Sequence, residues 1–143
     1  MQARVKWVEN MAFLGQAGSG HAVLMDASAE VGGNNMGPRP LEMLLMGAGG
    51  CTSVDVMSIL KKARAEVDSC EVELSAERAE TEPKVFTRIH LHFIIKGHAI
   101  RTELVERAID LSATKYCSAT IMLGKTAEVT HDFEIIESRP EAG

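Results

Sequence analysis

The chain has 143 residues, of which 45% are apolar and 24% charged, and its formal net charge is −5. This length suits one domain with a core of its own, and the apolar fraction excludes a disordered chain. The acidic balance argues against a nucleic-acid partner, because such surfaces need clustered lysine and arginine. No apolar run approaches the roughly 20 residues of a membrane helix without Gly, Asp or Lys interrupting it, so no membrane contact is expected.

The first ten residues, MQARVKWVEN, carry charges and lack the apolar segment of an export signal, so we expect a cytoplasmic protein. Three cysteines are an odd number, and structural disulfides are not expected in that compartment. None of the cysteines lies in a CxxC motif or has a histidine at the spacing of a zinc finger. We therefore expect neither a metal nor a cofactor.

The sequence predicts one domain over residues 1–143, in three parts. Residues 1–26 alternate between apolar and polar in short bursts separated by glycines, which predicts three short strands. Residues 27–40 are rich in Gly, Asn and Pro, which indicates a loop. Residues 41–143 then supply a core of helices and strands.

Residues 41–65, LEMLLMGAGGCTSVDVMSILKKARA, have the composition and the basic end of a helix. Apolar side chains occupy almost every face of it, which predicts a central helix buried inside the fold. Gly47, Gly49 and Gly50 each weaken such a helix by about 1 kcal/mol relative to alanine. We expect a close approach by another backbone or a ligand to offset that cost.

Residues 70–77 and 88–96 alternate strictly, which predicts an antiparallel hairpin with an acidic outer face on one strand beside a basic outer face on the other. The pattern then predicts an amphipathic helix over 101–116, a short apolar helix over 117–125 and a strand over 127–137. The tail from residue 138 should be loose. The predicted class is α+β, with a mainly antiparallel sheet packed on helices. So few strands cannot cover the central helix, which predicts an obligate homodimer.

Two of the cysteines lie at junctions between predicted elements. Cys51 follows a Gly-Gly pair within the helix, and Cys117 opens a short apolar segment whose helix N-terminus would lower a thiol pKa. Each is either a small buried apolar residue or a reactive thiol. A pair of reactive thiols suggests a peroxidatic cysteine, which becomes a sulfenic acid, and a resolving cysteine, which then forms a disulfide. Cys70 lies on the inward register of a strand and is assigned to the core.

The segments PLEMLLMGAGGCTSVDV (Pro40–Val56) and YCSATIML (Tyr116–Leu123), together with the order of elements, resemble the OsmC/Ohr family of osmotically inducible and organic hydroperoxide resistance proteins. The resemblance implies an intertwined homodimer in which mainly antiparallel sheets surround the central helices. It also implies that Cys51 is peroxidatic and Cys117 resolving. Family members reduce organic hydroperoxides in the oxidative stress response, and dithiols such as lipoylated proteins, or small thiols, regenerate them.

The chain departs from the family at two charged positions. The family has a Glu directly after the proline, whereas here Leu41 follows Pro40 and Glu42 comes next, nine residues before Cys51. At about 100° per residue, Glu42 would lie roughly opposite Cys51 on a regular helix. Glu42 remains the candidate catalytic acid. The family's activating Arg on an early strand has no clear equivalent, so Arg39 in the loop and Arg4 are the nearest candidates.

Asp55 lies one helical turn after Cys51, on the same face. A carboxylate there raises the thiol pKa unless a cation neutralises it. Asp55 is either a hydrogen-bonded group in the dimer core or a group that orients an arginine or the substrate. Met43 either lines an adaptable pocket for an alkyl chain or fills the core.

His90 and His92 share one strand face, a spacing that can bind a metal, but a solvated face beside acidic residues explains them as well. Two functions therefore remain open. The first is a thiol-dependent peroxidase for organic hydroperoxides. The alternative is a dimeric protein that binds an apolar ligand and lacks efficient peroxide chemistry.

Overall fold

The computed structural model describes residues 1–139. It divides into two compact units, Met1–Met46 and Gly47–Gly143. The predicted order of elements, three strands, a helix, two strands, two helices and a strand, is confirmed. Most of the tail predicted to be loose lies outside the described residues.

The first unit contains the antiparallel sheet β1-β2-β3, built from β1 (Ala3–Glu9), β2 (Ala12–Ala17) and β3 (Ala22–Asp26). These are the three strands that the alternation predicts. Every residue of β1 is exposed, including the apolar side chains of Val5 and Trp7. The apolar side chains of β1 therefore lie uncovered by the rest of residues 1–139.

The predicted loop is held in place by one buried carboxylate. Asp26, at the end of β3, is 2% exposed. It accepts backbone N–H bonds from Ala27 at 2.8 Å, Asn34 at 2.9 Å and Met36 at 3.1 Å. The bonds from Asn34 and Met36, followed by that from Ala27, hold the pKa of Asp26 below its usual range against the opposing effect of burial. The glycine-rich segment, which includes the 3₁₀ turn η1 (Ala29–Val31), is therefore anchored to its own strand.

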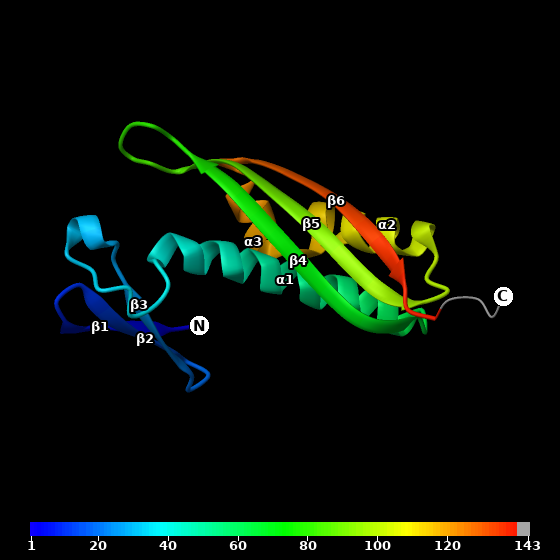
Figure 1. Cartoon of the computed structure of the whole chain (residues 1–143), viewed down its shortest axis with the longest axis horizontal. Helices are drawn as coiled ribbons and strands as arrows, with labels where there is room; N and C mark the ends of the chain where they lie inside the picture. The colour runs from blue at the N-terminus through cyan, green and yellow to red at the C-terminus, as the bar shows by residue number, and fades with distance from the viewer. Residues whose placement is uncertain (140–143) are drawn as a thin grey trace. The chain divides into compact units, whose positions relative to one another are not determined.

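The second unit packs helices on one face of the sheet β4-β5-β6 (Figure 1). Its strands are β4 (Glu66–Arg78), β5 (Phe86–His98) and β6 (Glu128–Glu137). β4 and β5 form the predicted antiparallel hairpin, while β6 pairs parallel to β5. The buried core comes mainly from central strand β5 and helix α2 (Thr102–Leu111), with the side chains of Phe86, Ile89, Leu91, Phe93, Ile95, Val105, Ala108 and Ile109.

Helix α1 (Pro40–Lys62) buries one face within the chain. Its buried residues recur every three or four positions: Ala48, Gly49, Thr52, Val56 and Leu60. A Cβ on Gly49 would lie 2.8 Å from Leu74 Cδ1 of β4, so the close neighbour there is a side chain and not the backbone or ligand that we expected. Gly47 and Gly50 have no such neighbour. On the opposite face Val54 is 70% exposed, so complete burial of the helix is not achieved within one chain.

The sequence-based exclusion of a membrane-spanning segment needs correction. By length and composition alone, α1 is long and apolar enough to cross a membrane. The core helix of a water-soluble protein passes the same test, and α1 packs one face on β4 and carries Lys61 and Lys62 in its last turn. We therefore interpret α1 as a core helix of the fold.

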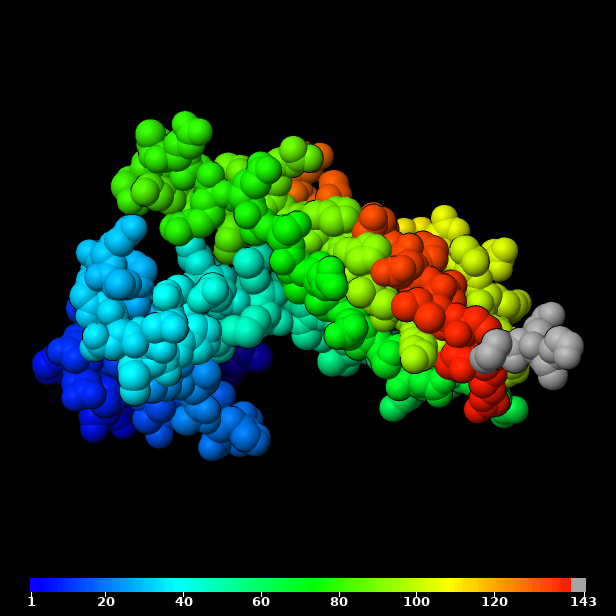
Figure 2. Space-filling view, in the orientation of Figure 1, coloured from blue at the N-terminus to red at the C-terminus, as the bar shows by residue number. Residues whose placement is uncertain are grey.

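The outer face of the sheet carries a ladder of histidines and acids, and Figure 2 shows this sheet with β4 in green and β6 in red. His90 is hydrogen-bonded through Nδ1 to Thr130 Oγ1 at 2.7 Å and through Nε2 to Asp132 Oδ1 at 3.0 Å. His92 bonds the same Asp132 oxygen at 2.6 Å and Glu134 at 3.1 Å. The sequence predicted acidic partners on β4, but the hydrogen-bonded partners come from β6, because its parallel register sets these residues beside the histidines.

This ladder predicts a pH-dependent contribution to stability. Hydrogen bonds to Asp132 and Glu134 raise the pKa of His92 above its ordinary 6.5, so the ion pairs stabilise the fold below that value and are lost as the pH rises through the folded-state pKa. Urea unfolding should therefore show the largest loss for His92→Gln between about pH 4.5 and 6 and a smaller loss above about pH 7.5. His21→Gln, whose hydrogen bond goes to Ser19, is the control, and a pH-independent loss for His92→Gln would contradict the ladder.

Candidate functional site

Cys51 and Cys117 come from different elements and are neighbours in the fold. Cys51 is half-buried on α1. Cys117 is 0% exposed and is the N-cap of α3 (Ser118–Leu123). The Cys51 thiol is near enough to raise the pKa of Cys117. The structure thus brings together the two thiols that the sequence singled out.

The environment of Cys117 favours the neutral thiol. Burial is the main cause that raises its pKa, and the neighbouring Cys51 raises it further. The backbone N–H of Thr120 donates to Sγ at 3.4 Å and opposes this shift. The predicted helix N-terminus is therefore present, but the expected lowering of the pKa is wrong because burial outweighs it. Cys51, the more exposed sulfur, is the one that a solute can reach.

The turn before Cys117 is tied to α1 by a hydroxyl. After α2 the chain forms a π-helical turn, η2 (Ser112–Tyr116), in which the Cys117 N–H donates to the Ser112 carbonyl at 2.8 Å. The Ser112 hydroxyl donates to Asp55 Oδ2 at 2.8 Å and lies 2.8 Å from the Thr52 hydroxyl. Ser112 is 0% exposed and Thr52 3%. Asp55 is therefore a hydrogen-bonded group, one of the two alternatives that its position left open.

Sequence reasoning missed Ser112 and Thr52, although a signal was present. Ser112 lies four residues after Ala108 and continues the apolar stripe of α2, while Thr52 lies between Ala48 and Val56 on the buried stripe of α1. One polar residue on each of two buried stripes indicates that the two side chains pair, because a buried hydroxyl needs a partner.

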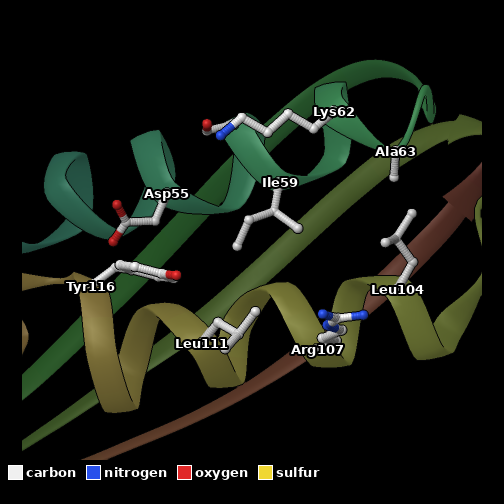
Figure 3. A pocket seen from close by; sticks show the side chains of 9 residues that line it. Asp55, Ile59, Lys62, Ala63, Leu104, Arg107, Leu111 and Tyr116 are labelled. Carbon is white, nitrogen blue, oxygen red and sulfur yellow. The ribbon is translucent and has the colours of Figure 1, made fainter.

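A groove of about 520 Å³ runs between α1 and α2 beside this tie (Figure 3). Its walls combine apolar and charged side chains: Asp55, Ser58, Ile59, Lys62, Ala63, Leu104, Arg107, Leu111 and Tyr116. Asp55 and Tyr116 lie at one end of the groove. Asp55 is one helical turn after Cys51, and Tyr116 directly precedes Cys117. The groove therefore starts beside the segments that carry the two thiols.

The remaining predicted site residues lie in the first unit, at the start of α1. Glu42 accepts the Arg39 N–H at 2.8 Å, which is how a glutamate in the first turn caps a helix. The Arg39 guanidinium donates to Asn35 Oδ1 at 2.9 Å and to the Gly37 carbonyl at 3.2 Å. Met43 is half-buried on α1. A catalytic role for Glu42 and substrate contacts by Arg39 and Met43 stay predictions.

The third cysteine and the histidines add no second centre. Cys70 is half-buried on β4, and burial raises its pKa. Over residues 1–139, no group of three or more His, Cys, Asp or Glu side chains is arranged to hold a metal ion. The chemistry that this site offers is therefore that of two adjacent thiols, one accessible and one buried.

The family model for OsmC-like proteins matches residues 32–132, a range that includes both cysteines. The chain belongs to the OsmC-like family. It is 51% identical over 136 residues to the protein YhfA of Escherichia coli (strain K12), a match that covers 95% of this chain and 98% of YhfA.

Two proteins of known structure share the fold. A hypothetical protein from Aquifex aeolicus VF5 superposes with a TM-score of 0.85 at 26% identity, covering 96% of this chain and 97% of that one. An organic hydroperoxide resistance protein from Elizabethkingia anophelis superposes with a TM-score of 0.63 at 20% identity, covering 92% and 94%. The predicted α+β fold and the family resemblance are thus confirmed.

The burial of the thiols predicts an order of alkylation. Fully reduced protein treated with iodoacetamide at pH 7 should be modified at Cys51 at least about tenfold faster than at Cys117, because only the accessible thiolate reacts. Peptide mass spectrometry over time measures both rates, and Cys51→Ser shows whether Cys117 reacts once its neighbour is gone. Equal rates for the two cysteines in the native chain would contradict the assignment.

Proposed function

We propose that this OsmC-like protein is a thiol-dependent peroxidase for organic hydroperoxides. The observation that carries the proposal is that a half-buried thiol, Cys51, neighbours a buried thiol, Cys117, closely enough to raise its pKa. The family includes proteins named for organic hydroperoxide resistance, which supports the same chemistry.

In the first step the Cys51 thiolate attacks the terminal oxygen of the hydroperoxide. An S–O bond forms, the O–O bond breaks, and the alkoxide takes up a proton and leaves as an alcohol. Cys51 is thereby oxidised by two electrons to a sulfenic acid. Its partial exposure suits this role, because the peroxide must reach the sulfur from solvent.

In the second step Cys117 loses its proton and attacks the sulfur of the Cys51 sulfenic acid. The S–S bond forms as the S–O bond breaks, and the hydroxide leaves as water after gaining a proton. Two equivalents of a small thiol, or one dithiol, then reduce the disulfide and are themselves oxidised. The high pKa of Cys117 keeps this cysteine protonated, so it does not compete for peroxide during the first step.

The groove supports an organic substrate. The apolar side chains of Ile59, Leu104 and Leu111 offer contact to an alkyl or aryl group, and Asp55 and Tyr116 link the groove to the cysteine-bearing segments. The same groove favours the alternative function, a binding protein for an apolar ligand.

The peroxidase proposal predicts a specific oxidation product. One equivalent of cumene hydroperoxide added to reduced protein should convert it rapidly to a Cys51–Cys117 disulfide, seen by intact mass and a non-reducing peptide map. In Cys117→Ser the reaction should stop at a Cys51 sulfenic acid, which dimedone traps.

Cys51→Ser is the control for peroxide attack, and Cys70→Ser should behave as the native chain. If the thiols stay reduced in excess peroxide, the peroxidase proposal falls and the groove should be screened for apolar ligands instead.

We also propose that the protein works as a homodimer. In the second unit the solvent-facing side of α1 carries exposed Val54. In the first unit Leu44 and Met46 on α1 and Val5 and Trp7 on β1 are exposed as well. Exposed apolar surface of this extent marks a protein interface, and a second copy of the chain is the partner that the family resemblance implies.

The dimer predicts a defined effect of charge on the solvent-facing side of α1. The native protein should elute with the mass of two chains in size exclusion with light scattering, and Val54→Asp should shift it toward one chain because a buried carboxylate is costly. Ser75→Asp, on the outer face of the sheet, is the matched control and should stay dimeric. A native chain that elutes as a monomer, or a dimeric Val54→Asp, would overturn the proposal.

A further inference from the structure

Ser112 makes the hydrogen bonds that connect the segments of the two cysteines. Its carbonyl accepts the N–H of Cys117 at 2.8 Å, so its backbone closes the turn that places the buried thiol. Its hydroxyl reaches α1 at two points, the side chains of Thr52 and Asp55, each at 2.8 Å. Thr52 directly follows Cys51, and Asp55 lies one turn farther along.

These hydroxyls form a directed chain. Because Ser112 donates its only hydroxyl hydrogen to the Asp55 carboxylate, it must accept from Thr52, so the order of donation is Thr52 to Ser112 to Asp55. Ser112 is 0% exposed, and water does not replace these partners in the folded chain. These hydrogen bonds therefore fix the turn to α1 beside Cys51, and the donor and acceptor of each bond are defined.

We propose that Ser112 is a positioning residue that holds Cys117 in reach of Cys51, with Thr52 and Asp55 as its anchors on α1. The inference rests on the proposed function, in which Cys117 resolves the Cys51 sulfenic acid. Ser112 touches neither sulfur in that reaction. It acts through the backbone of η2, and its effect is to raise the effective concentration of one thiol toward the other.

The experiment measures that effective concentration without peroxide. Native protein and variants are equilibrated at pH 7 in buffers of reduced and oxidised dithiothreitol, trapped with acid and alkylated, and the Cys51–Cys117 disulfide is quantified by mass. Ser112→Ala should lower the effective concentration at least about tenfold. Thr52→Val and Asp55→Ala should lower it in the same direction, and Asp55→Asn, which keeps an acceptor oxygen, should restore most of the loss caused by Asp55→Ala.

Thr114→Val is the matched control. Thr114 lies in the same turn, and its hydroxyl donates to the Asp110 carbonyl at 2.7 Å without reaching α1, so its loss should leave the effective concentration within about twofold of native. Urea unfolding of every variant separates a loss of stability from a loss of positioning. If Ser112→Ala does not fold, the two α1 variants carry the test.

Variants that lose stability but keep the native effective concentration would overturn the inference and leave the hydrogen bonds a purely structural role. A native chain that forms no Cys51–Cys117 disulfide in any buffer would overturn it too. A disulfide that forms in these buffers but not with hydroperoxide contradicts only the proposed peroxidase, so the two failures are distinguishable.

Discussion

The approach of α1 to β4 at Gly49 sets the arrangement of the site. A Cβ on Gly49 would lie 2.8 Å from Leu74 Cδ1, so a larger residue there would force the Leu74 side chain to shift. Gly49 therefore marks the side of α1 that faces β4. Cys51 follows two residues later, about 200° around the helix, so it lies on a different side of α1 from the one that packs on the strand.

The two thiols show how burial and helix capping compete. Cys117 is an N-cap residue and accepts the N–H bond expected at that position, which taken alone favours a thiolate. Complete burial acts the other way and is the stronger effect. In the proposed function this difference divides the roles, with the half-buried Cys51 meeting the hydroperoxide and the buried Cys117 reacting afterwards. Sequence position revealed the cap but not the burial, since burial depends on what the rest of the chain packs over it.

Patterns within one element were predictable from sequence, and pairings between distant elements mostly were not. Alternation located β4 and β5 and their antiparallel pairing, because a short turn joins them. Glu73 of β4 does pair with His92 as predicted, but the parallel pairing of β6 with β5 depends on two intervening helices, so the acids of β6 that hydrogen-bond His90 and His92 were not foreseen. The same limit applies to Ser112, which is 60 residues from Thr52. The roles of Cys51 and Cys117 came from family resemblance rather than from spacing.

The charge on the outer strands of the second sheet bears on how molecules of this protein meet one another. β4 and β6 are the two edges of that sheet, and both carry rows of acidic side chains on the outer face, among them Glu71, Glu73, Asp132 and Glu134. An exposed edge is a template for strand addition, and like charges on facing edges repel. Facing edges of two such sheets would therefore bring like charges together, which disfavours open-ended stacking of identical sheet edges.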